Sequence, residues 1–187
     1  MGLHIGIVGG GFVGRVHVEA LLAHPDVDRI SIADRDPVAL ETNARNYPTQ
    51  RAVSDHAALL EDPSLDVLDV CLPHDLHHPG VSEAFAAGVD VIADKPIANT
   101  LVEADEMLAA ADLAGRRFYL ALNQRVSPAH RRVKQLLDEG GIGLPSLATL
   151  TVAGDERARM GIPGHWNGSW ERAGGGALAD SGTHIVD

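Results

Sequence analysis

The stretch GIVGGGFVGRVH, residues 6–17, decides the fold of this 187-residue chain. Gly9, Gly11 and Gly14 form the pattern G-x-G-x-x-G directly after an apolar run and at the start of a helical pattern. In a nucleotide-binding βαβ unit, the first glycine allows a tight turn and the second lets the backbone approach a pyrophosphate. The third lets the helix pack closely on its strand. The stretch therefore predicts a dinucleotide-binding turn, against the alternative of a glycine-rich turn that binds another ligand or none.

An acidic residue, Asp34, follows the next apolar run, at the spacing from the glycines that such units use for ribose recognition. A carboxylate there can accept hydrogen bonds from both ribose hydroxyls of an adenosine, which favours NAD as the cofactor. Arg35 stands beside it and could instead hold a 2′-phosphate, so NADP is possible. Phe12 and Val13, at the start of the helix after the glycines, are also expected to contact the cofactor.

Short apolar runs alternate with Ala- and Leu-rich helical stretches along the first two thirds of the chain. This alternation predicts an α/β Rossmann fold, a doubly wound parallel sheet with helices on both faces. We expect it to occupy residues 1–122 as a cofactor-binding domain. The expected strands cover residues 3–8, 29–33, 51–53, 67–72, 89–93 and 118–122.

The pattern changes past Leu122, and residues 123–187 predict the truncated start of an α+β domain. A helix is expected at about 128–139, a strand at 146–154 and a final helix over about 177–187. One strand cannot satisfy its own backbone edges, so this segment needs further strands from elsewhere.

Composition and charge limit the partners of the chain. With 26 acidic and 15 basic residues the formal net charge is −11, which disfavours nucleic acids and anionic membranes as partners. The single cysteine, Cys71, excludes an intrachain disulfide framework. The first residues lack both a basic region and a long apolar run, so we expect neither a signal peptide nor a membrane span, and a cytoplasmic protein.

Two groups of polar residues stand where catalysis is expected. Lys95 follows the strand expected at 89–93, and open α/β sheets bind ligands at the carboxyl ends of their strands. Its ammonium could donate a hydrogen bond to a substrate oxygen. Asp180 and His184 are four residues apart, which would place them on one face of a helix, where the histidine could act as a general base. The alternatives are a surface lysine and a helix-capping aspartate beside a partly exposed histidine.

A loop rich in histidine, CLPHDLHHPG, begins at Cys71 and lies at the end of another expected strand. Pro73 and His77 are expected to line the cofactor pocket, together with Asp94 and Lys95. No acid or histidine spacing near the paired His77 and His78 completes a metal site, so no metal ion is expected. The other histidines are expected on the surface or in the core: His4, His17, His24, His56, His130 and His165.

Taken in order, these motifs resemble the glucose-fructose oxidoreductase, inositol dehydrogenase and rhizopine-catabolism (Gfo/Idh/MocA) family. The resemblance implies that Lys95, Asp180 and His184 are the catalytic group of an NAD(P)-dependent oxidoreductase. It would transfer hydride between a nicotinamide cofactor and a sugar, polyol or related hydroxylated substrate. The similar segments are GIVGGGFVGRVH, ADRDP (33–37), LPHDLHHPGVSEAFAAGVDVIADKP (72–96), NQR (123–125) and WERAGGGALADSGTH (170–184).

The chain departs from the family pattern at two positions and in length. Asp94 replaces the glutamate before the lysine, and His74 stands where a small amide is common. Members are typically about twice this long, so the resemblance implies that most of the sheet that covers the substrate is missing. A homo-oligomer, or another chain that supplies this sheet, is possible. Two alternatives stay open, a non-enzymatic NAD(P)-binding regulatory or sensor module, and a redox-assisted elimination or glycoside cleavage without net oxidation.

Overall fold

The computed structural model describes residues 2–151, 153 and 162–187, and its core is a parallel six-stranded sheet. The strand order is β3-β2-β1-β4-β5-β6, and every neighbouring pair is parallel. The order reverses between β1 and β4, the place where doubly wound folds bind ligands. This confirms the predicted Rossmann fold. The strands are β1 (Leu3–Val8), β2 (Val27–Ala33), β3 (Arg51–Val53), β4 (Val67–Val70), β5 (Asp90–Ala93) and β6 (Phe118–Leu120).

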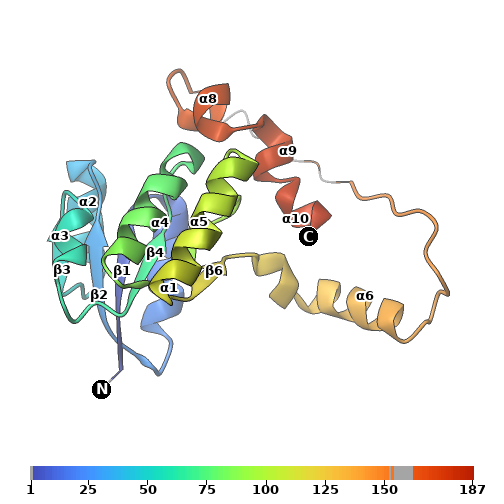
Figure 1. The fold of residues 1–187 in the computed structure, drawn as a ribbon, viewed down its shortest axis with the longest axis horizontal. Coiled ribbons are helices and arrows are strands. Elements are labelled where there is room, and N and C mark those ends of the chain that lie inside the picture. Colours follow the sequence, from blue (N-terminus) through green and yellow to red (C-terminus); the bar gives the residue numbers. More distant parts are fainter. Residues whose placement is uncertain (1, 152, 154–161) are drawn as a thin grey trace.

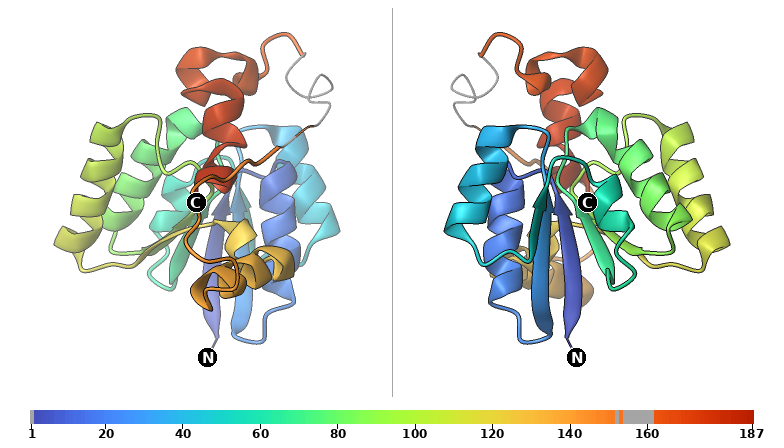
Figure 2. Two further views of the ribbon diagram at one scale, coloured as in Figure 1. Left: turned by 90° about the vertical axis from the view of Figure 1, so that its right-hand side faces the viewer. Right: turned by 90° about the vertical axis from the view of Figure 1, so that its left-hand side faces the viewer.

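Helices cover both faces of this sheet (Figure 2). On one face, α1 (Phe12–Leu22) and α2 (Pro37–Asn46) pack over a core of buried isoleucines from β1 and β2. On the other face, α4 (His77–Ala86) and α5 (Leu101–Ala114) enclose a larger apolar core. The short α3 (Ala57–Leu60) contributes Leu59 to that second core. Because both faces are buried, the inner strands read as continuous apolar runs, which is why the sequence located them.

Side-chain caps fix where two of these helices begin. Asp36 precedes α2 and its carboxylate accepts a hydrogen bond from the Val38 amide at 2.9 Å. Thr100 and Glu103 form a reciprocal capping box at the start of α5. Each arrangement satisfies backbone N–H groups that a helix leaves without partners in its first turn. The loops after β2 and β5 therefore have defined paths at the edge of the sheet where the site lies.

Beyond β6 the chain leaves the sheet. A 3-10 turn, η2 (Asn123–Val126), leads into α6 (Pro128–Asp138), which projects from the rest of the molecule (Figure 1). The helix predicted at 128–139 is thus present. The strand predicted at 146–154 is wrong for the residues that the structure describes, since 146–151 and 153 are exposed and in no strand, while 152 and 154 lie outside them. No neighbouring strand in the described part pairs with this segment, and an unpaired strand leaves its backbone groups unsatisfied.

The last described segment, residues 162–187, returns to the carboxyl edge of the sheet (Figure 1). The single helix predicted over 177–187 is wrong, because Asp180 ends one helix and His184 lies in the next. The break falls at Gly182, whose backbone passes so close to the Leu178 carbonyl that a Cβ there would lie 2.3 Å from the oxygen. The elements are η3 (Trp166–Gly168), α8 (Trp170–Ala173), α9 (Gly176–Asp180) and α10 (Thr183–Val186).

Candidate functional site

The glycine-rich turn between β1 and α1 is closely packed at two of its three glycines. Gly9 has a φ of +98°, and a Cβ there would lie 2.3 Å from the Cys71 carbonyl oxygen. A Cβ on Gly14 would lie only 1.9 Å from the Gly9 carbonyl oxygen. Gly11 differs, because a Cβ there would meet no described atom within 4 Å. The first and third glycines are therefore required for packing, whereas the second borders open space.

Two side chains hold the backbone of Gly10 in the middle of this turn. Asp34, at the end of β2, accepts a hydrogen bond from the Gly10 amide at 2.6 Å, and its other oxygen accepts one from the Asp36 amide at 2.8 Å. Asn43, buried on α2, donates to the Gly10 carbonyl at 2.9 Å. Asn43 could not be selected from the sequence, since its role depends on how α2 packs against the turn.

Helix α1 begins at this turn with its N-terminal amides directed to the edge of the sheet. Gly11 occupies the N-cap position, and no side chain caps the helix there. Uncapped amides at a helix N-terminus, with a positive helix dipole behind them, form an anion site. A pyrophosphate fits this position, because the open space beside Gly11 is where a side chain would otherwise stand.

A cavity of about 830 Å³ extends from the glycine-rich turn to the C-terminal segment. Most of the residues selected from the sequence line it. Two do not, because Gly14 is buried against the first glycine and His77 lies behind the wall. The predicted residues that line the cavity are Gly9, Gly11, Phe12, Val13, Asp34, Arg35, Pro73, Asp94, Lys95, Asp180 and His184.

His77 connects two loops of the site instead of facing the cavity. Its side chain is 0% exposed. Nδ1 lies 2.8 Å from the Pro96 carbonyl oxygen, and Nε2 lies 2.9 Å from the Leu72 carbonyl oxygen. The imidazole therefore ties the loop after β4 to the loop after β5. The cofactor contact expected of His77 is absent from this geometry, and the residue instead supports the backbone around Lys95.

Lys95 and Asp180 meet at the opposite end of the cavity from Asp34. The Lys95 ammonium forms an ion pair with the Asp180 carboxylate and also donates to the Asp180 carbonyl oxygen at 3.0 Å. Both side chains are almost buried, with 12% and 10% of their surface exposed. His184 lies four residues further along the chain, in α10, and lines the same cavity. Its Nδ1 is buried and has no hydrogen-bond partner among the described residues.

His74 and Trp166 form a wall of the cavity that the sequence did not assign. The two rings meet edge to face with their centroids 4.7 Å apart. His74 Nδ1 lies 2.9 Å from the Ala173 carbonyl oxygen, so this nitrogen donates to it. Burial lowers the pKa of His74 from its ordinary value. His74 thus joins the C-terminal segment to the Rossmann domain in its neutral form. Trp166 lies in an irregular, glycine-containing stretch, and such a pattern does not predict where a side chain lies in the fold.

We expect the contact between His74 and the C-terminal segment to weaken in acid. Because the folded-state pKa of His74 is lowered, the unfolded chain binds more protons, and the stabilisation present above about pH 6.5 is lost as the pH falls towards the folded pKa. The unfolding temperature should fall between pH 7.5 and 5.5, and His74→Asn should reduce that fall. At pH 7.5, His74→Asn should cost about 0.5–1.5 kcal/mol for the lost hydrogen bond. An equal fall in the unfolding temperature of the two proteins between pH 7.5 and 5.5 would contradict this assignment.

Comparison with known proteins assigns the chain to a family. Residues 3–122 match the family described as "Oxidoreductase family, NAD-binding Rossmann fold", and residues 130–187 match the GFO/IDH/MocA C-terminal domain. The chain belongs to the Gfo/Idh/MocA oxidoreductase family. The family assignment confirms the resemblance seen in the sequence. No helix in the described part of the chain is long and apolar enough to cross a membrane.

Several Gfo/Idh/MocA relatives are dehydrogenases of sugars and other hydroxylated compounds. The levoglucosan dehydrogenase of Pseudarthrobacter phenanthrenivorans is 31% identical over 99% of this chain and 50% of its own length. The mouse trans-1,2-dihydrobenzene-1,2-diol dehydrogenase is also 31% identical, over 100% of this chain and 55% of its own. This chain spans about half the length of the curated relatives it matches.

Two solved structures of family members carry a bound cofactor. A levoglucosan dehydrogenase in complex with NADH and levoglucosan is 30% identical, with a TM-score of 0.87 over 100% of this chain and 52% of its own. The Bordetella pertussis WlbA dehydrogenase in complex with NADH and UDP-GlcNAcA is 26% identical, with a TM-score of 0.89 over 100% of this chain and 57% of its own.

Proposed function

We propose that the protein is an NAD-dependent dehydrogenase that oxidises a CH–OH group of a sugar, polyol or related hydroxylated substrate. The observation that carries the proposal is one cavity with two ends. The glycine-rich turn and the Asp34 carboxylate line one end, and Lys95, Asp180 and His184 line the other. The sugar and inositol dehydrogenases among the relatives support this class of substrate. We further propose that the cofactor domain ends at residue 122 and the second domain starts at residue 123.

The N-terminal amides of α1, beside Gly11, would bind the pyrophosphate of NAD. The Asp34 carboxylate would accept hydrogen bonds from the hydroxyls of the adenosine ribose. Bound NAD would supply the hydride acceptor for this oxidation. The protein is left with the tasks of orienting the substrate and moving one proton.

His184 would take the hydroxyl proton of the substrate as general base. Its Nδ1 is buried, so Nε2 is the ring nitrogen left to receive the proton. Lys95 would donate a hydrogen bond to the reacting oxygen, which carries increasing negative charge as the proton leaves. Asp180 holds the ammonium of Lys95 in place through their ion pair. Each oxidised CH–OH group thus yields one carbonyl, one hydride for the cofactor and one proton for His184.

Absorbance at 340 nm tests this function directly. The purified protein would be incubated with NAD and, in turn, with levoglucosan, myo-inositol and a panel of free sugars, while the products are followed by mass spectrometry. Net formation of NADH, together with a product that has two hydrogens fewer than the substrate, would support the dehydrogenase. Bond cleavage without NADH would favour a redox-assisted elimination, and NADH binding without turnover on the panel would favour a regulatory module.

Substitution of Asp34 should change the preference between the two cofactors. We expect Asp34→Ala to weaken NAD binding at least about tenfold and NADP binding less, because the lost bonds join a charged group to the ribose hydroxyls. Arg35→Ala is the matched variant and should weaken NADP alone. Binding constants for both cofactors can be measured by tryptophan fluorescence. An equal loss for both with Asp34→Ala would show that this carboxylate acts only by holding Gly10.

A further inference from the structure

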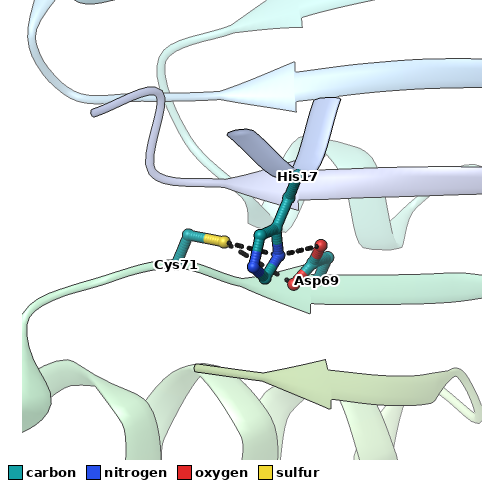
Figure 3. Close-up of side chains that lie close together, drawn as sticks. All are labelled: His17, Asp69 and Cys71. Atoms are coloured by element: carbon teal, nitrogen blue, oxygen red, sulfur yellow. Dashed lines mark hydrogen bonds and ion pairs between the residues drawn. The ribbon is translucent and has the colours of Figure 1, made fainter. Parts of the chain in front are cut away.

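Three potential metal ligands from different parts of the chain lie close together, His17, Asp69 and Cys71 (Figure 3). His17 projects from α1, while Asp69 and Cys71 come from β4 and the residue after it. Residues two apart on a strand share a face, so the carboxylate and the thiol both point towards α1. One donor atom from each side chain lies within 4.8 Å of the other two. The sequence did not suggest this cluster because His17 is remote from the other two residues along the chain.

We propose that His17, Asp69 and Cys71 bind a divalent transition-metal ion of the Zn²⁺ type. A thiolate, an imidazole and a carboxylate are the ligands that proteins use for Zn²⁺, whereas Mg²⁺ and Ca²⁺ prefer oxygen alone. Three protein ligands leave a fourth position open. His17 and Cys71 both line the cavity, so this position and the entry path for the ion lie on the cavity side.

A rotation of the Asp69 carboxylate would bring the three side chains to the spacing of a tetrahedral site. Around such an ion, nitrogen, oxygen and sulfur donors lie roughly 3.3–3.6 Å apart, given their bond lengths to Zn²⁺. His17 Nδ1 lies 3.4 Å from Cys71 Sγ, which is within this range. The carboxylate contacts the two through different oxygens, Oδ1 at 3.6 Å from the sulfur and Oδ2 at 2.8 Å from the imidazole nitrogen. A single carboxylate oxygen therefore has to turn towards both partners when the ion binds.

The charges of the ligands match a divalent ion. Bound as ligands, the Asp69 carboxylate and the Cys71 thiolate carry two negative charges, and the His17 imidazole is neutral. A divalent ion neutralises them, and the thiol proton leaves to solvent. Buried charges are tolerated when they are paired or coordinate a metal.

Cobalt absorption spectroscopy tests the site, with Co²⁺ as a coloured substitute for Zn²⁺. Metal-free protein would be titrated with CoCl₂ in the absence of cofactor. We expect one equivalent to bind, with visible bands of a tetrahedral ion and a thiolate-to-cobalt band in the near ultraviolet. Cys71 is the only cysteine in the sequence, so that band identifies its sulfur as a ligand. Zn²⁺ should abolish the spectrum and Mg²⁺ should not.

Substitutions of the three ligands distinguish Co²⁺ binding at this cluster from Co²⁺ binding by other histidines. We expect Cys71→Ser to lose the thiolate band, and His17→Gln and Asp69→Asn to weaken Co²⁺ binding more than about 100-fold, beyond the usual effect of losing an outer-shell partner. His130→Gln, on the exposed α6, is the matched control and should bind as the wild type does. Absence of the thiolate band in folded wild-type protein at saturating CoCl₂ would overturn the proposal and leave a hydrogen-bonded triad. This test uses the wild-type protein alone, so it does not depend on whether a variant folds.

Discussion

Replacing Lys95 with methionine is expected to lower kcat about 10²–10³-fold while the affinity for NADH changes only a few fold. The reason is that the ammonium would act on the reacting oxygen in the transition state, where one positioned donor has an effect of this size. His184→Ala should reduce kcat by a similar or larger factor, because it removes the proposed base. Stopped-flow measurement of NADH formation, together with NADH binding, gives both quantities. Full activity in either variant would reject its assigned role.

The ion pair of Lys95 requires a control for stability. Removal of one partner from a buried pair costs about 3–5 kcal/mol, because the other charge stays buried. Lys95→Met should therefore lower the unfolding temperature as well as kcat. The double variant Lys95→Met/Asp180→Asn removes both charges and should recover much of the stability but none of the turnover. Recovery of turnover together with stability would mean that Lys95 has only a structural role.

Alanine at Gly14 is expected to destabilise the fold by about 3 kcal/mol or more and to abolish cofactor binding. Its Cβ would lie 1.9 Å from the Gly9 carbonyl oxygen, so α1 and the glycine-rich turn would have to move apart. Gly11→Ala is the matched variant, since its Cβ meets no described atom within 4 Å. We expect it to unfold within about 0.5 kcal/mol of the wild type but to bind NADH at least tenfold more weakly.

Urea unfolding and NADH titration of the two glycine variants distinguish packing from ligand contact. The two alanines add the same methyl group at the N-cap and at the third residue of the same helix, so any general effect on the start of α1 should be common to both. Normal NADH binding by Gly11→Ala would place the pyrophosphate elsewhere in the cavity. Normal stability of Gly14→Ala would show that the turn can open without cost.

The Rossmann domain could be predicted from the sequence because its signals are local. β1, β2 and β4 are buried on both faces and therefore read as apolar runs, and Gly9 and Gly14 mark a turn whose geometry tolerates no side chain at these two positions. The placement of Lys95 and Asp34 at strand ends followed from the topology. Most of the predicted site residues consequently line one cavity.

The errors came where structure depends on distant partners. The segment at 146–151 has the apolar pattern of a strand, but strand formation requires a neighbour to pair with. The last helix was predicted to run through Gly182, because helical spacing alone does not show that one helix ends at Asp180 and the next begins at Thr183. The roles of His74, Asn43 and the cluster at His17 arise from contacts across the fold, which no periodicity in the sequence encodes.

The connection between α6 and the C-terminal segment has a consequence for how the protein can vary. Lys95 and Asp180 are 85 residues apart, and between them residues 145–151 are exposed and free of regular structure. The entropy lost on closing a flexible loop grows only with the logarithm of its length, so doubling a loop costs about 0.6 kcal/mol. Insertions or deletions in this connection should therefore leave the pairing of lysine and aspartate almost unaffected. The contact between these two side chains is in this sense independent of the length of the connection.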